Sequence, residues 1–468
     1  MDHDQQGEEP IGSYWRNRLY TSHLLFSEEE TFRDGRDRMC LPGHINLGAR
    51  KLLSVTDSSI TLASLSLRPT QLLAQITNSF CSLSNCDIHI STTPPFLAQQ
   101  PEQYPAYAGK LTITHDSDSD QNGGAIAVIL DGSNNEECRL TVDLETCHFS
   151  NTTARTGEGG AIFFNVQGDS ECSGSIVIRA KTEFSDCISN VGGCIRSSIS
   201  SSQPISFMLD DSFVESSTAE TGGGITHEVL LSSTSSFSVN ECRIRNCSSN
   251  CGGSFMFIIH EYLAISIAHT TFNASTSSQE GGCIAIKQYK STTNHPFSLI
   301  LSHLFIHHCS SKYMGGCVFV EQVGVDIEGE SVITCDQIDA THCSSSSYGG
   351  FFYLNQTGSM NLSMSTSLIQ SLFANSWGAF LYCIASKHRD LPISLTITIS
   401  NVNFTDLSCA QGSLLHWPNT SCPLSIFLTL EYVSVKKLDC VFPGSLIRLD
   451  PCSVPVEREC VLKNCYIA

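Results

Sequence analysis

Short segments in which large apolar residues alternate with smaller or polar ones recur along the chain, and most of them directly follow a pair of glycines. Residues 157–165, GEGGAIFFN, are one example. Alternation with a period of two predicts a β-strand that buries one face, so we expect the apolar columns to line an interior. The residues two places after each pair are all large and apolar: Ile126, Ile162, Ile195, Ile225, Phe255, Ile284, Val318, Phe352, Phe380 and Leu414. The residues four places after each glycine pair are mostly apolar: Val128, Phe164, Ser197, His227, Phe257, Ile286, Val320, Leu354, Tyr382 and His416.

The glycine pairs themselves form a repeat, with spacings from 29 residues (Gly252 to Gly281) to 36 residues (Gly123 to Gly159). Such a period is typical of solenoids. Glycine adopts positive φ without steric cost, so each pair predicts a sharp corner. None precedes a GKS or GKT ending, which disfavours a phosphate-binding loop. The predicted corners are Gly123, Gly124, Gly159, Gly160, Gly192, Gly193, Gly222, Gly223, Gly252, Gly253, Gly281, Gly282, Gly315, Gly316, Gly349 and Gly350, followed by degenerate copies at Trp377-Gly378 and Gln411-Gly412.

Each repeat contains two further apolar segments, such as residues 175–179 and 182–187. Three strands and three turns per repeat predict an all-β fold, a single right-handed parallel β-helix solenoid of about a dozen three-strand coils. We expect a charged N-terminal arm or cap at 1–40 and early coils at 41–120. Repeats with diglycine corners should span 121–420, and Cys-rich terminal coils or a cap should span 421–468.

The glycine pair is preceded in several repeats by a phenylalanine motif: Phe184-Ser185-Asp186-Cys187, Phe213-Val214-Glu215-Ser216, Phe272-Asn273-Ala274-Ser275 and Phe404-Thr405-Asp406-Leu407. Together the two motifs resemble the repeats of chlamydial polymorphic outer-membrane proteins and of protist surface proteins with a pectin-lyase-like β-helix. Cysteine or serine often stands where those repeats have asparagine. The resemblance covers about residues 120–415 and implies adhesion or surface display rather than catalysis.

Composition bears on partners and location. The net charge is −20, with 46 acidic and 26 basic residues, which disfavours nucleic acid or an acidic membrane as partner. The sequence contains no run of 18 apolar residues, so it predicts no membrane-spanning helix. The 23 cysteines and the Asn-x-Ser/Thr sequons favour a cell-surface or secreted glycoprotein, although the first residues lack a secretory signal pattern. The possible glycosylation sites are Asn151, Asn246, Asn273, Asn355, Asn361, Asn403 and Asn419.

The residues three places after each glycine pair should point outward: Ala127, Phe163, Arg196, Thr226, Met256, Ala285, Phe319, Tyr353, Leu381 and Leu415. Exposed together, the apolar members would form a large surface patch. We expect Phe163, Met256, Phe319, Tyr353 and Leu381 to contact a protein or glycan at a surface. The alternative is that turn insertions or the N-terminal arm cover this column.

The sequence predicts no catalytic residue, no metal ligand and no cofactor. A carbohydrate-active β-helix enzyme, of polysaccharide lyase or glycosidase type, is the alternative function. After the glycine corners, the nearest carboxylates are Glu228 and Glu321, three coils or roughly 14 Å apart. A glycosidase needs two carboxyl groups roughly 5–10 Å apart, so these two should not form a catalytic pair.

Two patterns suggest metal sites, and both are better explained otherwise. The acidic turn from Asp116 to Asn122 has Ala127 where an EF-hand loop needs glutamate, so we expect a solvated turn. His308 and His342 should share one face of their strands while Cys309 and Cys343 share the other, which prevents tetrahedral zinc binding. Stacked thiols or a disulfide between these two cysteines are expected instead. Cys194, Cys283 and Cys317 should be small residues packed at the corners.

Overall fold

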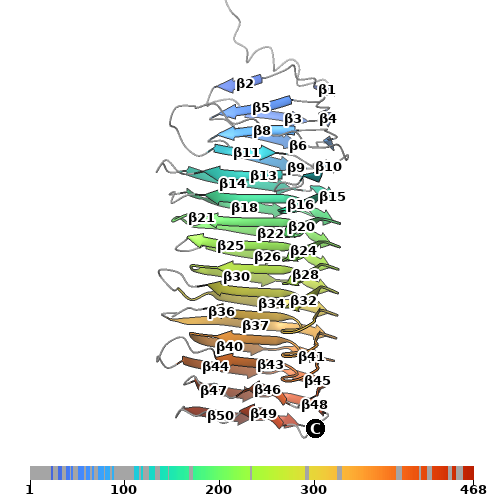
Figure 1. Ribbon diagram of the computed structural model, residues 1–468, viewed down its shortest axis with the longest axis vertical. Coiled ribbons are helices and arrows are strands. Elements are labelled where there is room, and N and C mark those ends of the chain that lie inside the picture. Colours follow the sequence, from blue (N-terminus) through green and yellow to red (C-terminus); the bar gives the residue numbers. More distant parts are fainter. Residues whose placement is uncertain are drawn as a thin grey trace, which may run out of the picture.

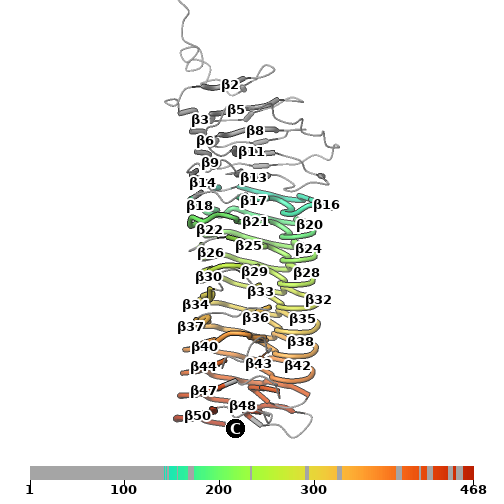
Figure 2. Tube along the Cα trace, turned by 60° about the vertical axis from the view of Figure 1, so that its left-hand side comes forward, coloured from blue at the N-terminus to red at the C-terminus, as the bar shows by residue number. Residues whose placement is uncertain are grey.

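The computed structural model describes residues 147–467, except 168–171, 232–234, 290–294, 324–328, 386–392, 411–412, 419–423, 441–444 and 450–456; before residue 147 it describes strand backbones and a few buried side chains. The described part is an all-β, right-handed parallel solenoid of about nine turns without a helix. This confirms the predicted fold class. In Figure 1 the coils stack along one long axis, and Figure 2 shows the same stack turned by 60°.

One coil shows how the chain winds. It runs through β21 (Ile195–Ser200), β22 (Ile205–Asp210), β23 (Phe213–Glu215) and β24 (Thr218–Thr221) before the next glycine pair. The coil therefore has four strands rather than the predicted three. The predicted third segment corresponds to β23 and the bend at Ser216 (φ 53°), and β24 occupies the stretch that was expected to be the turn before the next glycine pair.

Strands of successive coils pair in parallel and form four ladders, which we number in the order in which a coil visits them. The first ladder is the 15-stranded sheet: β2 (Glu30–Arg33), β5 (Lys51–Thr56), β8 (Leu72–Thr77), β11 (Lys110–Thr114), β13 (Ile126–Asp131), β17 (Ile162–Gln167), β21, β25 (Ile225–Leu231), β29 (Phe255–Ile259), β33 (Ile284–Tyr289), β36 (Val318–Val323), β39 (Phe352–Gln356), β43 (Leu381–Ala385), β46 (Ser413–Trp417) and β49 (Ser445–Leu449).

The other three ladders together form the 34-stranded sheet. The second ladder contains β3 (Arg38–Pro42), β6 (Ser59–Ala63), β9 (Phe80–Ser84), β14 (Cys138–Glu145), β18 (Cys172–Arg179), β22, β26 (Ser235–Asn240), β30 (Leu263–Ala268), β34 (Ser298–His307), β37 (Glu330–Thr341), β40 (Ser359–Ser365), β44 (Ile393–Ser400), β47 (Leu424–Glu431) and β50 (Arg458–Lys463). The third contains β7 (Ser66–Leu67), β10 (Asp87–Ile88), β15 (His148–Ser150), β19 (Glu183–Ser185), β23, β27 (Arg243–Arg245), β31 (Thr271–Asn273), β41 (Leu368–Gln370), β45 (Asn403–Cys409), β48 (Ser434–Cys440) and β51 (Tyr466–Ile467). The fourth contains β12 (Asp118–Ser119), β16 (Thr153–Glu158), β20 (Ile188–Val191), β24, β28 (Ser248–Cys251), β32 (Thr276–Glu280), β35 (Ser310–Ser311), β38 (Ser344–Ser345) and β42 (Phe373–Ala374).

Some strands run through a bend and serve two ladders: β34 and β37 extend from the second into the third, and β45 and β48 from the third into the fourth. Near the N-terminus, β11 pairs antiparallel with both β8 and β13, and β1 (His23–Leu24) pairs with β4 (His44–Ile45). Within the predicted arm and the Asp116–Asn122 turn only the strand backbones of β1, β2, the start of β3 and β12 are described, and the Gly123-Gly124 corner lies outside the described residues.

The interior is the continuous apolar core that the inward columns predict. Ile162, Ile195 and Ile225 are at most 1% exposed, and they pair in register across β17, β21 and β25. Aromatic side chains stack from coil to coil, as Phe207 and Phe237 do with ring centroids 4.8 Å apart. Each fully buried Ile or Phe contributes about 1.5–3 kcal/mol of apolar burial, so the core is the main source of stability.

The glycine pairs are corners, as predicted, and the two positions have different roles. The first glycine is left-handed, as at Gly159 (φ 68°), and this φ recurs down the column to Gly378. The second packs against the next coil, because a Cβ on Gly160 would lie 2.1 Å from the carbonyl oxygen of Gly193. No side chain fits at that distance, so the second glycine allows the coils to approach closely.

The other two sharp bends of each coil are also left-handed but carry residues other than glycine. Between the second and third ladders the bend residues are Lys181, Asp211, Glu241, His269, His303, Gln337, Thr366, Asn401, Tyr432 and Asn464. Between the third and fourth they are Asn151, Asp186, Ser216, Asn246, Ala274, His308, His342, Ser371, Asp406 and Lys437. The second set explains the phenylalanine motif, since the inward Phe precedes the bend by two residues. Phe213 is an exception, because Val214 takes the inward place in its coil.

The register of the last coils differs from the prediction. Leu381 pairs with Phe352 and Tyr382 pairs with Tyr353, so the corner is Gly378-Ala379 and not Trp377-Gly378. Leu381 and Leu415 therefore belong to the inward column, whereas Tyr382 and His416 lie in the outward one. Phe380 and Leu414 were expected in the inward column; they lie one residue before it in the sequence and are nevertheless buried.

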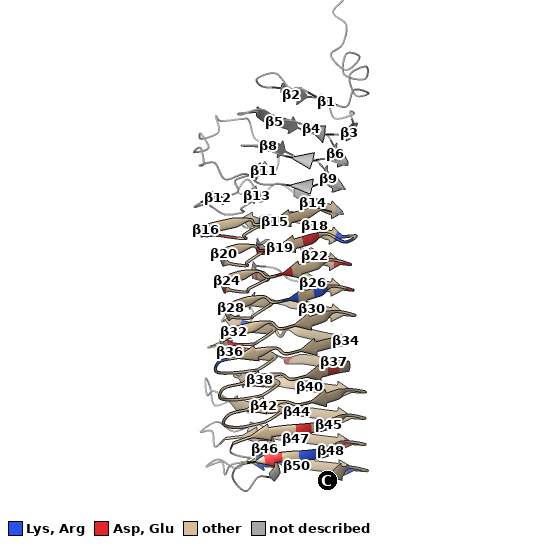
Figure 3. Ribbon diagram, turned by 90° about the vertical axis from the view of Figure 1, so that its right-hand side faces the viewer, with Lys and Arg blue, Asp and Glu red and all other residues tan. Residues whose placement is uncertain are grey.

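The outward face of the second ladder carries mainly small hydroxyl side chains. One column across adjacent coils contains Ser238, Ser266, Ile300, Thr334, Ser363, Thr398 and Thr429. Charged residues are sparse on the side of the solenoid shown in Figure 3. Ion pairs between coils occur on the third ladder, as between Arg245 and Glu215, and also at the diglycine bend.

Candidate binding site at the diglycine bend

The outward column of the first ladder is buried, so the expected exposed patch is wrong. Phe163 and Met256 are 3% exposed, Phe319 1% and Tyr353 6%. The fifth residue expected on this patch, Leu381, lies in the main core because of the register change. The sequence alternation correctly placed Phe163, Met256, Phe319 and Tyr353 on the outer side of their strands. It could not show which side chains cover them.

For Met256, Phe319 and Tyr353 the cover comes from residues that directly precede a glycine pair. Met256, Ala285, Phe319 and Tyr353 form a second apolar cluster against Cys251, Met314 and Tyr348 of the chain entering the corner. Outward side chains on both sides of the corner thus touch each other, which means that the diglycine bend is concave toward solvent.

The bend also holds two groups of ion pairs. In the first, Arg196 contacts Glu158 (Nε–Oε2 3.0 Å), which lies just before a glycine pair, and also Glu228 on the neighbouring strand β25. The Arg196 side chain is only 7% exposed. Burial favours the neutral form of Glu228, but the hydrogen bond from His260 and the charge of Arg196 outweigh it and lower the pKa of Glu228.

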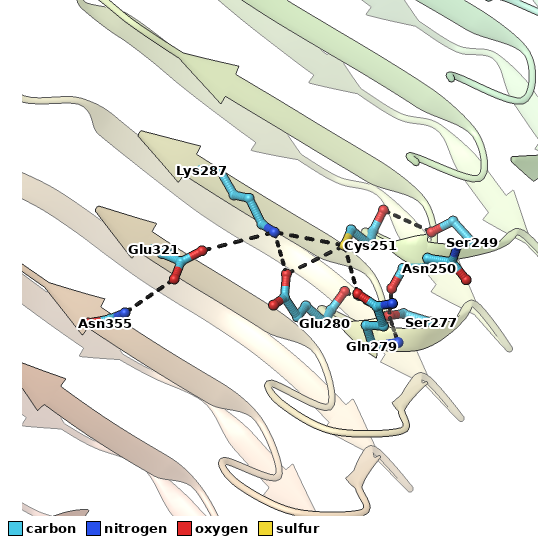
Figure 4. A network of polar contacts seen from close by, with 9 residues as sticks. All are labelled: Ser249, Asn250, Cys251, Ser277, Gln279, Glu280, Lys287, Glu321 and Asn355. Carbon is cyan, nitrogen blue, oxygen red and sulfur yellow. Dashed lines mark hydrogen bonds and ion pairs between the residues drawn. The ribbon is translucent and has the colours of Figure 1, made fainter. Parts of the chain in front are cut away.

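The second group centres on Lys287 of β33, shown in Figure 4. Its Nζ lies 2.7 Å from Glu280, 4.0 Å from Glu321 and 3.9 Å from the Cys251 sulfur. Burial opposes the charge on Lys287, but the hydrogen bond to Glu280 and the surrounding acidic groups raise its pKa. Burial and Glu280 raise the pKa of Cys251 to about 11, so this thiol is protonated at neutral pH.

Towards the C-terminus the bend becomes aromatic. Tyr353 stacks on Phe319 (5.3 Å between centroids) and on Tyr382 (5.5 Å). From the opposite side of the corner, Tyr348 lies 4.7 Å from Tyr382, and the Trp377 ring packs against His416 and under the Arg448 guanidinium. Tyr348, Trp377 and Tyr382 are partly exposed. We call the ion pairs and these rings together the bend strip: Glu158, Arg196, Glu228, Glu280, Lys287, Glu321, Tyr348, Trp377 and Tyr382.

The bend strip contains residues that the sequence analysis missed. Glu228 and Glu321 were identified, but each was expected to stand apart from a second carboxylate. Glu158 and Glu280 supply that second carboxylate from the strand before the corner, and a basic residue lies between the two members of each pair. A signal was available in the sequence, because both glutamates stand within two residues before a glycine pair.

The histidine and cysteine residues have the orientation that was expected. His308 and His342 are exposed and stack in parallel with centroids 4.8 Å apart, whereas Cys309 and Cys343 are buried. Cys194, Cys283 and Cys317 are buried at the corners. Within the described residues no group of three His, Cys, Asp or Glu side chains is arranged to hold a metal, and no disulfide joins two of the cysteines described there.

The sequons differ in their accessibility. Asn151, Asn246, Asn273 and Asn403 are exposed, and all four lie on the third ladder or at its bend into the fourth. Asn361 is partly buried on β40, and Asn355 is partly buried on β39 with its Nδ2 donating to Glu321 at 3.3 Å. Asn419 lies outside the described residues. The exposed sequons thus lie on a different side of the coil from the bend strip.

No protein-family description, curated protein or solved structure matches the chain at significant similarity. Among the described residues there is no helix with the length and hydropathy needed to cross a membrane. The site must therefore be interpreted from its own chemistry.

Proposed function

We propose that the protein is a non-enzymatic surface or secreted solenoid for adhesion or ligand display, and that the bend strip contacts a glycan. The observation that carries this proposal is the arrangement of the strip along one concave bend: two groups of ion pairs, separated by one coil, are followed towards the C-terminus by aromatic rings. Aromatic rings offer apolar faces for sugar rings, while carboxylate, ammonium and amide groups hydrogen-bond hydroxyl groups. A linear glycan would lie along the solenoid axis.

The charge states of the strip support binding rather than catalysis. A lyase base must lose its proton near the working pH, but the pKa of Lys287 is raised. A glycosidase acid needs a raised pKa, but that of Glu228 is lowered. Arg196 and Lys287 are each held by carboxylates, so they serve as fixed hydrogen-bonding groups.

The test is binding to an array of immobilised polysaccharides by the full chain and by a Trp377→Ala/Tyr382→Ser variant. Both rings are partly exposed, so the variant should fold, which circular dichroism and thermal unfolding check. We expect at least tenfold weaker binding, since loss of a stacked ring commonly costs more than about 1.4 kcal/mol in binding. The matched control is Phe305→Ser, because Phe305 is 51% exposed on β34 away from the bend. Equal binding by all three proteins would refute the proposal.

Phe319 and Tyr353 are unsuitable positions for this test, because both rings are buried and their removal would leave a cavity. One observation favours the alternative of a carbohydrate-active enzyme: Glu280 and Glu321 both reach Lys287. That alternative predicts release of reducing ends or unsaturated uronides from a bound polysaccharide, and loss of this release in Glu280→Gln. Binding without product formation supports the display function.

A further inference from the structure

Two cysteines lie directly above one another near the C-terminal end of the solenoid. Cys409 ends β45, Cys440 ends β48, and the two residues are register partners in adjacent parallel strands. Their sulfur atoms are 3.6 Å apart. Neighbouring strands are about 4.8 Å apart, which is within the Cα separation of about 4.4–6.8 Å that a disulfide needs.

The column to which these cysteines belong otherwise holds small residues. Ser277, Ser311, Ser345 and Ala374 occupy it in the preceding coils, each in register with the next. Their small size suits an inward position close to a corner, where both Ser345 and Ala374 are buried. Cysteine is the only residue type in proteins that fits such a position and can also join two coils covalently.

Accessibility distinguishes this pair from the other stacked cysteines. Cys440 is partly exposed, so a small disulfide can reach it from solvent. Cys309 and Cys343 also lie at equivalent places on adjacent coils, but both are fully buried. They therefore provide a control inside the same molecule.

We propose that Cys409 and Cys440 form a thiol–disulfide exchange site that takes small dithiol-derived or glutathione-type disulfides and closes to a cross-coil disulfide. The Cys440 thiolate attacks one sulfur of glutathione disulfide, forms a mixed disulfide and releases one glutathione thiolate. The Cys409 thiolate then attacks the Cys440 sulfur and releases the second glutathione. Two protein thiols lose two protons and two electrons, and one glutathione disulfide is reduced to two glutathione molecules.

The second step should be the slow one. Burial, together with the neighbouring Cys440, raises the pKa of Cys409 to about 12. Only a small fraction of this thiol is ionised at pH 8, and that fraction grows about tenfold for each pH unit. The mixed disulfide on Cys440 should therefore accumulate first, and its conversion to the cross-link should accelerate as the pH rises from 7 to 9.

The experiment treats the native full chain with glutathione disulfide, blocks the remaining thiols with N-ethylmaleimide, and maps the peptides by mass spectrometry. We expect a peptide pair joined through Cys409 and Cys440, with Cys309 and Cys343 unmodified until the protein is denatured. Cys409→Ser should stop at the glutathione adduct on Cys440, and Cys440→Ser should leave Cys409 unmodified. The exposed Cys460 reports that the reagent is active.

Two results would overturn the proposal. One is a wild-type protein that stops at the Cys440 adduct at every pH, as Cys409→Ser does. The other is a cross-link from Cys440 to Cys460 or Cys465 in place of Cys409. Because serine closely matches cysteine in size, both variants should fold, and thermal unfolding of the reduced proteins verifies this before the oxidation is compared.

Discussion

His227 offers a sharp test of the inward columns, because it is an ionisable side chain in an apolar core. It is fully buried on β25, and its ring lies 4.9 Å from Phe237 and 5.8 Å from Phe207. Neither ring nitrogen has a hydrogen-bond partner. Burial, assisted by the positive charge of Arg196, lowers its pKa to about 3. We predict that His227→Phe stabilises the protein and removes part of its sensitivity to acid.

The magnitude follows from the pKa values in the two states. The unfolded imidazole titrates near pH 6.5, so between about pH 6.5 and 3 the unfolded chain binds a proton that the folded chain does not. Stability is therefore lost as the pH falls through this range. At pH 5 the loss is about 2 kcal/mol relative to pH 7.5. Two unpaired buried nitrogens add a pH-independent cost of about 1–3 kcal/mol, which phenylalanine avoids.

The assay is urea denaturation of wild type and His227→Phe at pH 7.5 and pH 5.0. The difference in unfolding free energy between the two proteins should grow by about 2 kcal/mol at the lower pH. Phe257→Leu is the control, since it perturbs the neighbouring coil in the same column without adding or removing a titrating group. A variant whose advantage is the same at both pH values would refute the inward position of His227.

Three further predictions concern single features of the solenoid. Gly282→Ala should destabilise the protein by about 3 kcal/mol or more, because the new Cβ would lie 2.1 Å from the Gly316 carbonyl oxygen. The control variant Gly224→Ala should cost far less, since Ser254 and Cys283 already carry a Cβ in the column of Gly224. Gln322→Leu should cost about 2–4 kcal/mol of unfolding free energy, because it leaves the buried N–H groups of Thr357 and Gly358 without an acceptor. Gln356→Leu should be neutral or stabilising, because the Gln356 amide has no hydrogen-bond partner. Urea denaturation measures the two glycine variants and the two glutamine variants. In a secretory host, glycopeptide mapping should find glycans on Asn151, Asn246, Asn273 and Asn403 and none on Asn355, whose amide donates to Glu321; a glycan on Asn355 of the secreted, folded protein would contradict this.

Much of the fold could be predicted from the sequence because its main determinants are local. Period-two alternation places Ile162 and Phe164 in the core, and glycine is required where φ is positive and a neighbouring coil approaches closely, as at Gly159-Gly160. The other two bends are less visible, because residues as different as Lys181, Asp186 and Asn246 adopt the same left-handed conformation. The four-strand coil was missed for that reason.

The candidate site was harder to predict because it depends on the angle between two strands. Alternation places Phe319 on the outer side of β36, but its burial depends on Met314 and Tyr348 across the bend. The ion pairs likewise join residues on the two sides of the corner, such as Glu280 and Lys287. At Gly378-Ala379 the second glycine is replaced, and without that marker the register of Leu381 and Tyr382 was displaced by one residue.

The central claim is that the diglycine bend folds back over the outward column and leaves only its rim open to a ligand. Hydroxyl-radical footprinting of the native chain, read out by mass spectrometry, tests this directly. Phe319 and Tyr353 should be oxidised far more slowly than Phe305, Tyr313 and Tyr432, which are 51%, 45% and 55% exposed. Rapid oxidation of Phe319 and Tyr353, at rates like those of the three exposed rings, would contradict the account.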